Sequence, residues 1–526
     1  MYSRHSFSFF FSALFLPIDN LSILYTSHLK IQTPNASCLL FTSLTPFSIF
    51  VANSCSLCHE TLSTSQPESH QIPQLVNQFS SPSHIHQIQA QLILQNLHSN
   101  TTIAHHFITA CQSLGLLDSA LLLFTHHSKP HVFICNSLIR AFSHNHTPHT
   151  PFSIYTHMHS NSILPNNFTF PFLLKSLADF KGLSEGQCIH THVVKLGQFD
   201  DIYVQNSLLN VYASCGDMGL CMRVFDEMPH RDVVSWTVLI TGYRSAERYD
   251  DALIAFEQMQ YAGVVPNHVT MVNALSACAD FGALEMGVWI HEFIRRSGWE
   301  FDVILGTSLI DMYGKCGRIE EGLVVFRSMK EKNVFTWNSL IKGLALARSG
   351  EEAVWWFYRM EQEGIKADEV TLIAVLCACS HSGMVQMGRQ IFGSLMNGKY
   401  GFSPGVKHYA CVIDLLARAG ILQEAMEVMT RMRFEPNKVM WGAFLAGCRA
   451  HGDLELSEFA ARKLVELEPG NGAYYVLLSN IYAEMGRWSD VEKVRRLMKE
   501  GGLTKDLGCS SIELEPQERV YELLAE

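Results

Sequence analysis

The sequence repeats itself with a period of 101 residues, and this repeat restricts the possible folds more than any other feature. Asn136, Thr237 and Asn338 stand at the same point of three successive periods, after the related strings VFIC, VVSW and VFTW. Two further sets keep the same spacing, namely Asn206 with Thr307, and Pro171 with Val272 and Ile373. A period this strict predicts a solenoid, because each unit of a solenoid buries its apolar face only against its neighbours.

Each period divides into units of 35, 35 and 31 residues, and the apolar residues inside a unit have helical spacing. Ala252, Phe256 and Met259 stand at i, i+4 and i+7 of one stretch, which is the spacing of one helix face. The stretch before it carries its apolar face at Trp236, Leu239, Ile240 and Tyr243. Each unit is therefore predicted to be a helix hairpin, so the expected fold class is an all-α solenoid of helix-turn-helix repeats.

The composition agrees with a large helical protein and restricts the kind of partner. The chain has 526 residues, of which 48% are hydrophobic and 17% are charged, and its formal net charge is −11. A protein that binds nucleic acid without sequence preference is normally basic. The charge therefore argues against that class, but it leaves open a protein that reads bases and lines its groove with its few Lys and Arg residues.

The first 65 residues differ from the rest and are predicted to be a transit peptide and linker. They are rich in Ser and Phe and contain a single acidic residue, Asp19, before Glu60. Abundant Ser and few acidic residues are typical of organelle transit peptides. The run FSFFFSALFLPI at residues 7–18 is an alternative secretory signal and is too short to span a bilayer. Because scattered free cysteines conflict with secretion, we expect a mitochondrial location, with the chloroplast as the alternative, and no membrane association.

Histidines cluster in one unit, but no carboxylate or thiol accompanies them at ligand spacing. The cluster consists of His144, His146, His149, His157 and His159. This pattern favours a solvated segment between helices over a metal site. The zinc deaminase pattern H-x-E followed by P-C-x-x-C does not occur in the sequence either. We therefore expect no metal, no cofactor and no catalytic residue, so the chain is predicted not to be an enzyme.

The unit lengths, their order and their anchor residues resemble pentatricopeptide repeats of the plant PLS class. In that class a 35-residue P unit, a 35-residue L unit and a 31-residue S unit alternate, and the repeats form a right-handed superhelix. The resemblance implies an array at 66–437, with P-L-S triplets at 132–232 and 233–333, a P unit at 334–368 and closing L-like and S-like units at 369–405 and 406–437. Residues 438–506 resemble the two E motifs, which are tetratricopeptide-like hairpins, and 507–526 a truncated extension without a DYW deaminase domain.

The resemblance also implies which residues bind RNA. In this family the fifth and the last residue of a unit choose the base, and the second residue flanks the base plane. The implied base-reading pairs are Asn136 with Asn166 for a pyrimidine (C before U), Asn206 with Asp232 for U, Thr237 with Asn267 for A, Thr307 with Asn333 for A, and Asn338 with Asp368 for U. The implied base-sandwiching residues are Phe133, Tyr203, Val234, Ile304 and Phe335, with ordinary packing at a helix start as the alternative. The predicted target is 5′-Y-n-U-A-n-A-U-3′.

The expected function follows from this resemblance. It implies a sequence-specific single-stranded RNA-binding protein of a plant organelle that selects sites for C-to-U RNA editing. Its partners would be organelle RNA, a DYW-type cytidine deaminase supplied in trans, and other proteins of the editing complex. Two alternatives stay open at this point: an organelle RNA splicing or stability factor, and a tetratricopeptide-like scaffold for protein interactions.

Overall fold

A computed structural model describes residues 82–94, 99–125, 130–144 and 149–503. The predicted transit peptide and linker at 1–65 and the predicted extension at 507–526 lie outside these residues. The N-terminal part of the first predicted repeat unit lies outside them too. The description that follows concerns the compact unit that begins at His70.

The described residues form 25 α-helices and no strand, which confirms the all-α class. The helices are α2 (Pro82–Leu94), α3 (Thr101–Ser113), α4 (Leu117–Thr125), α5 (Val132–Ser143), α6 (His149–Ser160), α7 (Phe170–Asp179), α8 (Leu183–Lys195), α9 (Ile202–Cys215), α10 (Met218–Glu227), α11 (Val233–Ser245), α12 (Tyr249–Tyr261), α13 (His268–Phe281), α14 (Leu284–Arg296), α15 (Val303–Lys315), α16 (Ile319–Ser328), α17 (Val334–Leu346), α18 (Gly350–Gln362), α19 (Glu369–His381), α20 (Val385–Met396), α21 (Val406–Arg418), α22 (Leu422–Arg431), α23 (Lys438–Ala450), α24 (Leu454–Leu467), α25 (Gly472–Glu484) and α26 (Trp488–Glu500).

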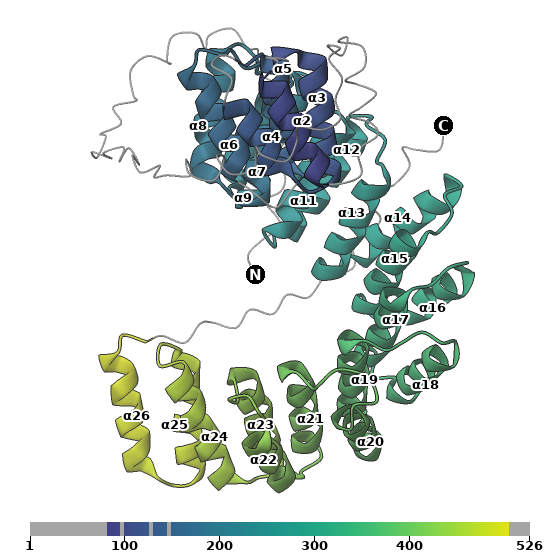
Figure 1. The fold of residues 1–526 in the computed structure, drawn as a ribbon. Coiled ribbons are helices and arrows are strands. Elements are labelled where there is room, and N and C mark those ends of the chain that lie inside the picture. Colours follow the sequence, from purple (N-terminus) through teal and green to yellow (C-terminus); the bar gives the residue numbers. More distant parts are fainter. Residues whose placement is uncertain (1–81, 95–98, 126–129, 145–148, 504–526) are drawn as a thin grey trace, which may run out of the picture. The chain divides into compact units, whose positions relative to one another are not determined.

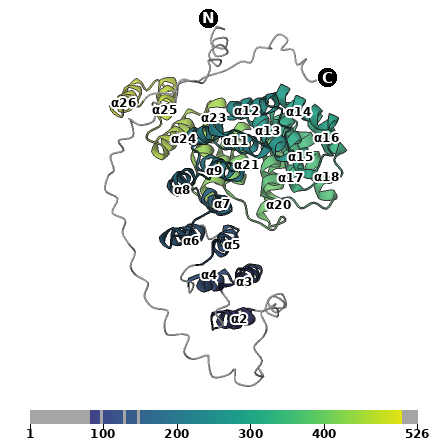
Figure 2. The same cartoon turned by 90° about the horizontal axis from the view of Figure 1, so that it is seen from above.

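These helices are stacked in pairs that make two layers (Figure 1). From α3 to α23, each odd-numbered helix packs against the next odd-numbered helix, so the odd helices form one continuous layer. Each even-numbered helix from α4 to α24 packs against the odd helix before it and the odd helix after it. The two layers separate clearly in Figure 2, where α3 and α5 lie on one side and α4 and α6 on the other. The predicted handedness of the superhelix stays a prediction.

The hydrophobic core lies between the two layers and follows the predicted helical spacing. Ala252, Phe256 and Met259 of α12 are fully buried, as the i, i+4, i+7 pattern predicts. The face predicted for the preceding helix α11, which carries Trp236 and Ile240, is also buried. Because every unit contributes such a pair of faces, the core continues along the stack rather than closing around one centre.

Two local features differ from the sequence prediction. The period places a helix start at residue 167, but α7 begins at Phe170, because Pro171 has no N–H to donate to the carbonyl of Asn167 and the first turn cannot close. The interpretation of the histidine cluster as a segment between helices is wrong for three of its members, since His149 begins α6 and His157 and His159 lie in its last turn.

Among the described residues, no helix combines the length and the hydropathy that a bilayer crossing requires.

Candidate nucleic-acid interface

Four of the five predicted base-reading units end in a residue that caps the odd helix that follows it. The Asp232 side chain accepts hydrogen bonds from the backbone N–H groups of Val234 and Ser235 at the start of α11. Asn267, Asn333 and Asp368 cap α13, α17 and α19 in the same way. These polar residues therefore have a local reason to stand before each helix, because an N-cap side chain satisfies N–H groups that have no partner in the helix.

In the three units with Asn at position five, the fifth and last side chains contact each other directly. Asn206 Nδ2 donates to Asp232 Oδ1 at 3.2 Å. The other two contacts have the same form, with Asn136 Nδ2 donating to Asn166 Oδ1 and Asn338 Nδ2 donating to Asp368 Oδ1, both at 3.0 Å. The structure thus brings together the side chains of all three predicted Asn pairs.

In the two units with Thr at position five, another Thr joins the members of the pair. The hydroxyl oxygens of Thr237 and Thr270 lie 2.7 Å apart, and Thr270 Oγ1 donates to Asn267 Oδ1 at 2.9 Å. Thr336 stands in the same way between Thr307 and Asn333. The predicted Thr pairs are therefore neighbours, and a bridging hydroxyl links them.

Polar contacts also connect the first turns where position five is apolar. Asn167 Nδ2 donates to Asp201 Oδ2 at 3.1 Å between α7 and α9. His268 Nε2 lies 2.9 Å from Asp302 Oδ2 between α13 and α15. Together with the five predicted pairs, these contacts form what we call the polar strip, which runs along the first turns of the odd helices from α5 to α19.

Hydrogen bonding favours the charged form of the carboxylates in the polar strip. Partial burial by itself raises the pKa of Asp232, but the hydrogen bonds from Ser235, Asn206 and the Val234 backbone outweigh it, so the pKa is lowered. The pKa of Asp368 is lowered by the same balance, with Thr371 and Asn338 as donors. Both carboxylates are therefore ionised at neutral pH and act only as acceptors.

Exposed apolar residues accompany the polar strip at the second position of the units. The five predicted base-sandwiching residues are between 44% (Phe133) and 72% (Tyr203) exposed. Phe168, Val269, Val370 and Val439 take the same position in other units and are exposed as well. Because all nine side chains remain open to solvent, packing into the core does not explain their apolar character. We call these nine residues the apolar row.

The basic side chains of the odd helices are only partly available to bind phosphates. Lys315 lies 2.6 Å from Asp280 and 2.9 Å from Asp311, and Lys342 also approaches Asp311. Arg244 donates to the Asn273 side chain at 3.1 Å. The condition set by the net charge, that Lys and Arg residues line the groove, is therefore met only in part.

Sequence reasoning missed two sets of residues in this region. The first is the L-unit part of the apolar row, Phe168, Val269 and Val370, and the second is a set of hydroxyl residues that includes Thr169, Thr270 and Thr371. Both sets are spaced by 101 residues. The period itself was therefore a signal that could have identified them.

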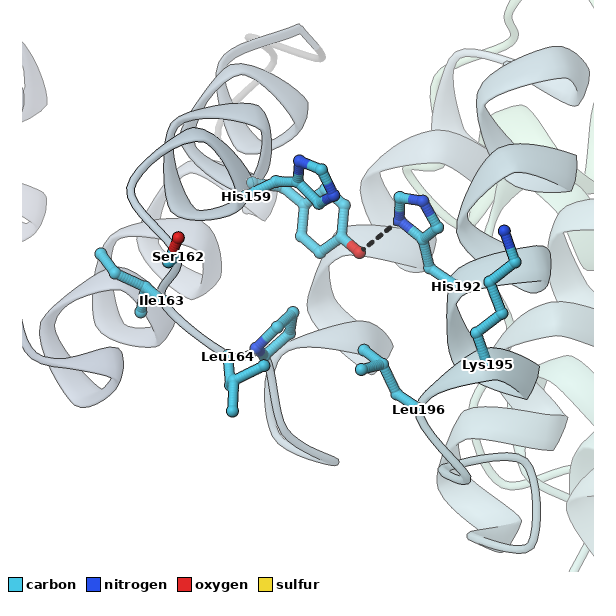
Figure 3. Close-up of a pocket in the computed structure, with 9 residues that line it drawn as sticks. His159, Ser162, Ile163, Leu164, His192, Lys195 and Leu196 are labelled. Atoms are coloured by element: carbon cyan, nitrogen blue, oxygen red, sulfur yellow. Dashed lines mark hydrogen bonds between the residues drawn. The ribbon is translucent and has the colours of Figure 1, made fainter.

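A separate cavity lies at the C-terminal ends of α6 and α8 (Figure 3). It has a volume of about 470 Å³, and Leu164, Lys195 and Leu196 line it together with Tyr155, His159 and His192. The Tyr155 hydroxyl lies 3.0 Å from His192 Nδ1, and the rings of His159 and His192 stack. Burial, followed by the nearby His159 and Lys195, lowers the pKa of His192. None of the residues of the polar strip or the apolar row lines this cavity.

Models of known repeat families match this chain in the region of the helix pairs. A model described as the PPR repeat family matches residues 231–280, and one described as the PPR repeat matches 206–233, 307–334, 335–365 and 408–435. A model described as the E motif matches residues 451–513. This last match overlaps the segment 438–506, where the sequence resembles E motifs, and it includes the hairpin of α25 and α26.

The chain is also similar to pentatricopeptide repeat-containing proteins of Arabidopsis thaliana. One is 37% identical, with 84% of this chain and 89% of the relative covered. A relative named as mitochondrial is 35% identical over 82% of this chain and 83% of its own length. A relative named as chloroplastic is 36% identical over 84% of this chain and 73% of its own length.

Among solved structures, the fold is similar to that of the pentatricopeptide repeat protein PPR10 in complex with an 18-nucleotide psaJ RNA element. The TM-score is 0.64 at 16% sequence identity, and the match covers 83% of this chain and 65% of PPR10. At this identity the similarity concerns the fold alone.

Proposed function

This chain belongs to the pentatricopeptide repeat family and carries an E motif, and from this premise we propose that it binds single-stranded organelle RNA in a sequence-specific way and selects sites for C-to-U editing. The observation that carries the proposal is that the polar strip and the apolar row occur together on the first turns of the same helices. The polar strip offers hydrogen-bonding groups for base edges, and the apolar row offers surfaces for base planes.

The Asn206 and Asp232 pair has the groups that uracil requires. One amide hydrogen of Asn206 is used by Asp232 Oδ1, which leaves the second amide hydrogen and the other carboxylate oxygen for a base. Uracil presents an N–H donor between two carbonyl acceptors, so the carboxylate can accept from the base and the amide can donate to it. Cytosine would instead point an unprotonated nitrogen at the carboxylate. Because Asn206 is only 8% exposed, the base has to approach along the edge of this amide.

The other pairs offer different groups. In the Thr237 unit, Asn267 Oδ1 already accepts from Thr270, so its amide nitrogen remains as a donor for N1 of adenine and the Thr237 oxygen as an acceptor for the adenine amino group. In the Asn136 unit, Asn166 replaces the carboxylate and offers a donor, which suits the unprotonated N3 of cytosine. These assignments support the predicted target 5′-Y-n-U-A-n-A-U-3′.

Binding to synthetic RNA tests the recognition step. The purified chain should bind a single-stranded RNA that carries the target, and a wrong base at a read position should weaken binding by about 1–3 kcal/mol. Changes at the two n positions should have little effect. Equal affinity for all of these RNAs would contradict base reading and favour the protein-interaction scaffold.

RNA sequencing from a plant without this protein tests the editing role. We expect loss of C-to-U conversion at one or a few organelle sites, in the mitochondrion or, as the alternative, in the chloroplast. The chain alone should deaminate no cytidine, because we propose that a DYW-type deaminase acts in trans with other proteins of the editing complex. Unchanged editing together with altered splicing or transcript abundance would favour a splicing or stability factor instead.

A further inference from the structure

A hydroxyl residue stands next to every polar fifth residue that belongs to a predicted pair. It is the third residue of the following unit. Four of the five lie in the first turn of the next odd helix, and Thr169 is the N-cap of α7. The five residues are Thr169, Ser235, Thr270, Thr336 and Thr371, next to Asn136, Asn206, Thr237, Thr307 and Asn338 respectively. Each hydroxyl lies 2.6–2.9 Å from the fifth side chain.

The hydroxyl is absent where the fifth residue is apolar. The units with Pro171, Val272 and Ile373 at position five are followed by units whose third residues are Val204, Leu305 and His408 respectively. Helix capping does not explain this difference, because Asp201 and Asp302 cap α9 and α15 without any hydroxyl at the third position. Four of the hydroxyls also accept from the backbone N–H of the cap residue in a capping box, but capping alone does not require them, so within the predicted pairs the hydroxyl accompanies the polar fifth residue.

The contacts fix the orientation of the amide in the Asn units. The Asp232 carboxylate is ionised and can only accept, so the Asn206 atom that faces it must be Nδ2. The Ser235 hydroxyl lies 2.7 Å from the other amide atom, Oδ1, and 2.9 Å from Asp232 Oδ1. A rotation of the amide by half a turn would bring two acceptors, Asn206 Oδ1 and Asp232 Oδ1, together, and it would remove the oxygen to which the Ser235 hydroxyl can donate.

The same hydroxyl fixes the direction of the donor in the Thr units. Thr270 Oγ1 lies 2.9 Å from Asn267 Oδ1 and 2.7 Å from Thr237 Oγ1, and when its proton goes to Asn267 it presents a lone pair toward Thr237. The Thr237 proton is then directed to Thr270 or to the Val233 carbonyl, and the Thr237 oxygen keeps a lone pair for a ligand. In both kinds of unit the third-position hydroxyl contacts the fifth side chain and restricts the groups that this side chain offers.

We propose that this hydroxyl is a positioning residue that determines base specificity together with the fifth and last residues. The inference rests on the proposed RNA-binding function. It implies that each reading unit contains three residues, the third of which belongs to the next repeat. Without the hydroxyl, the fifth side chain loses one of the contacts that hold its orientation, so the unit still binds RNA but loses part of its discrimination.

The test compares Ser235→Ala with Ser235→Thr in the full chain. Affinities are measured for four RNAs that differ only in the nucleotide matched to the Asn206 unit. In Ser235→Ala the preference for U over C should fall about threefold to tenfold, as expected for the loss of one neutral hydrogen bond, while preferences at the other nucleotides stay unchanged. Ser235→Thr should retain the preference. Thr371→Val, which keeps the side-chain volume, should show the same loss at the nucleotide of the Asn338 unit.

Controls separate this proposal from a structural role and from the proposed function itself. Ser276→Ala removes a hydroxyl of the same layer that donates only to its own helix, and it should leave all preferences unchanged. Two outcomes in Ser235→Ala and Thr371→Val would overturn the positioning role. One is an equal loss of affinity for all four bases, and the other is a lower unfolding temperature with an unchanged base preference. If the unaltered chain shows no base preference at these nucleotides, the proposed function fails instead.

Discussion

Gly314 of α15 and Gly343 of α17 bring two neighbouring odd helices into backbone contact. A Cβ atom placed on Gly314 would lie 2.8 Å from the Cα atom of Gly343, which is closer than two carbon atoms can pack. The odd layer therefore depends on small residues where consecutive units stack. Because the polar strip consists of contacts between these same neighbouring helices, helix spacing also sets the distances within the predicted base-reading pairs.

The first prediction concerns this close approach. Gly314→Ala should destabilise the protein by about 1–3 kcal/mol, because the added methyl group forces α15 and α17 apart. Chemical denaturation monitored by circular dichroism measures the change. Gly442→Ala in α23 is the matched control, since no atom lies within 4 Å of its added Cβ, and it should stabilise the helix by about 0.5–1 kcal/mol. Equal effects of the two variants would contradict the proposed role of the contact.

The second prediction concerns the apolar row. Tyr203→Ala should weaken RNA binding by about 1–3 kcal/mol, as for the loss of one base stacked on an aromatic ring. Because Tyr203 is 72% exposed, the free energy of unfolding should change little. Tyr261→Ala, at the end of α12 in the other layer, is the control, and it should affect neither property. A loss of stability without a loss of RNA affinity would mean that Tyr203 serves the fold.

The third prediction concerns acid. The folded pKa of Asp232 lies below the ordinary value of 3.8, so the unfolded chain binds this proton more readily than the folded chain does. The stabilisation by the carboxylate is therefore fully present above about pH 4 and is lost as the pH falls through the folded pKa. Unfolding experiments should show that the stability advantage of the unaltered chain over Asp232→Asn shrinks below that pH. Asp368→Asn should behave alike, and a constant advantage in both cases would contradict the assignment.

Most of the fold could be predicted because it follows from periodicity alone. The spacing of Ala252, Phe256 and Met259 identified a buried helix face, and the period predicted where nearly every odd helix starts. The exception is α7, where Pro171 removes the N–H that the first turn needs. There the chemistry of a single residue outweighs the repeat, and only the local hydrogen bonds reveal it.

The candidate site was less predictable, because it depends on which side chains meet between units. The pairing of Asn206 with Asp232 could be anticipated from the family resemblance. The contact of Ser235 with Asn206 could not, since it requires the distance between the first turns of α9 and α11. The sequence pattern also does not show that Lys315 lies between the carboxylates of Asp280 and Asp311. These two contacts make Lys315 less available to bind a phosphate.

The last prediction exchanges the specificity of one unit. Thr237→Asn combined with Asn267→Asp should move the preference of that unit from A toward U, because the new pair reproduces the contact of Asn338 with Asp368. Thr270 already supplies the third-position hydroxyl, so no further change is needed to orient the new amide. Both new residues occur at the same positions of the next P unit, and Asp is a good N-cap for α13, so the fold should survive.

The measurement is the affinity of the double variant and of the unaltered chain for RNAs that carry A or U at the matched nucleotide. The double variant should bind the U-containing RNA more tightly than the A-containing one, and the difference should be about 1–3 kcal/mol, as for other single-base contacts. Adding Thr270→Val should then reduce the new preference for U, because the amide of the introduced Asn loses the hydroxyl that orients it. Weaker binding to both RNAs, with no exchange of preference, would show that this pair does not read the base.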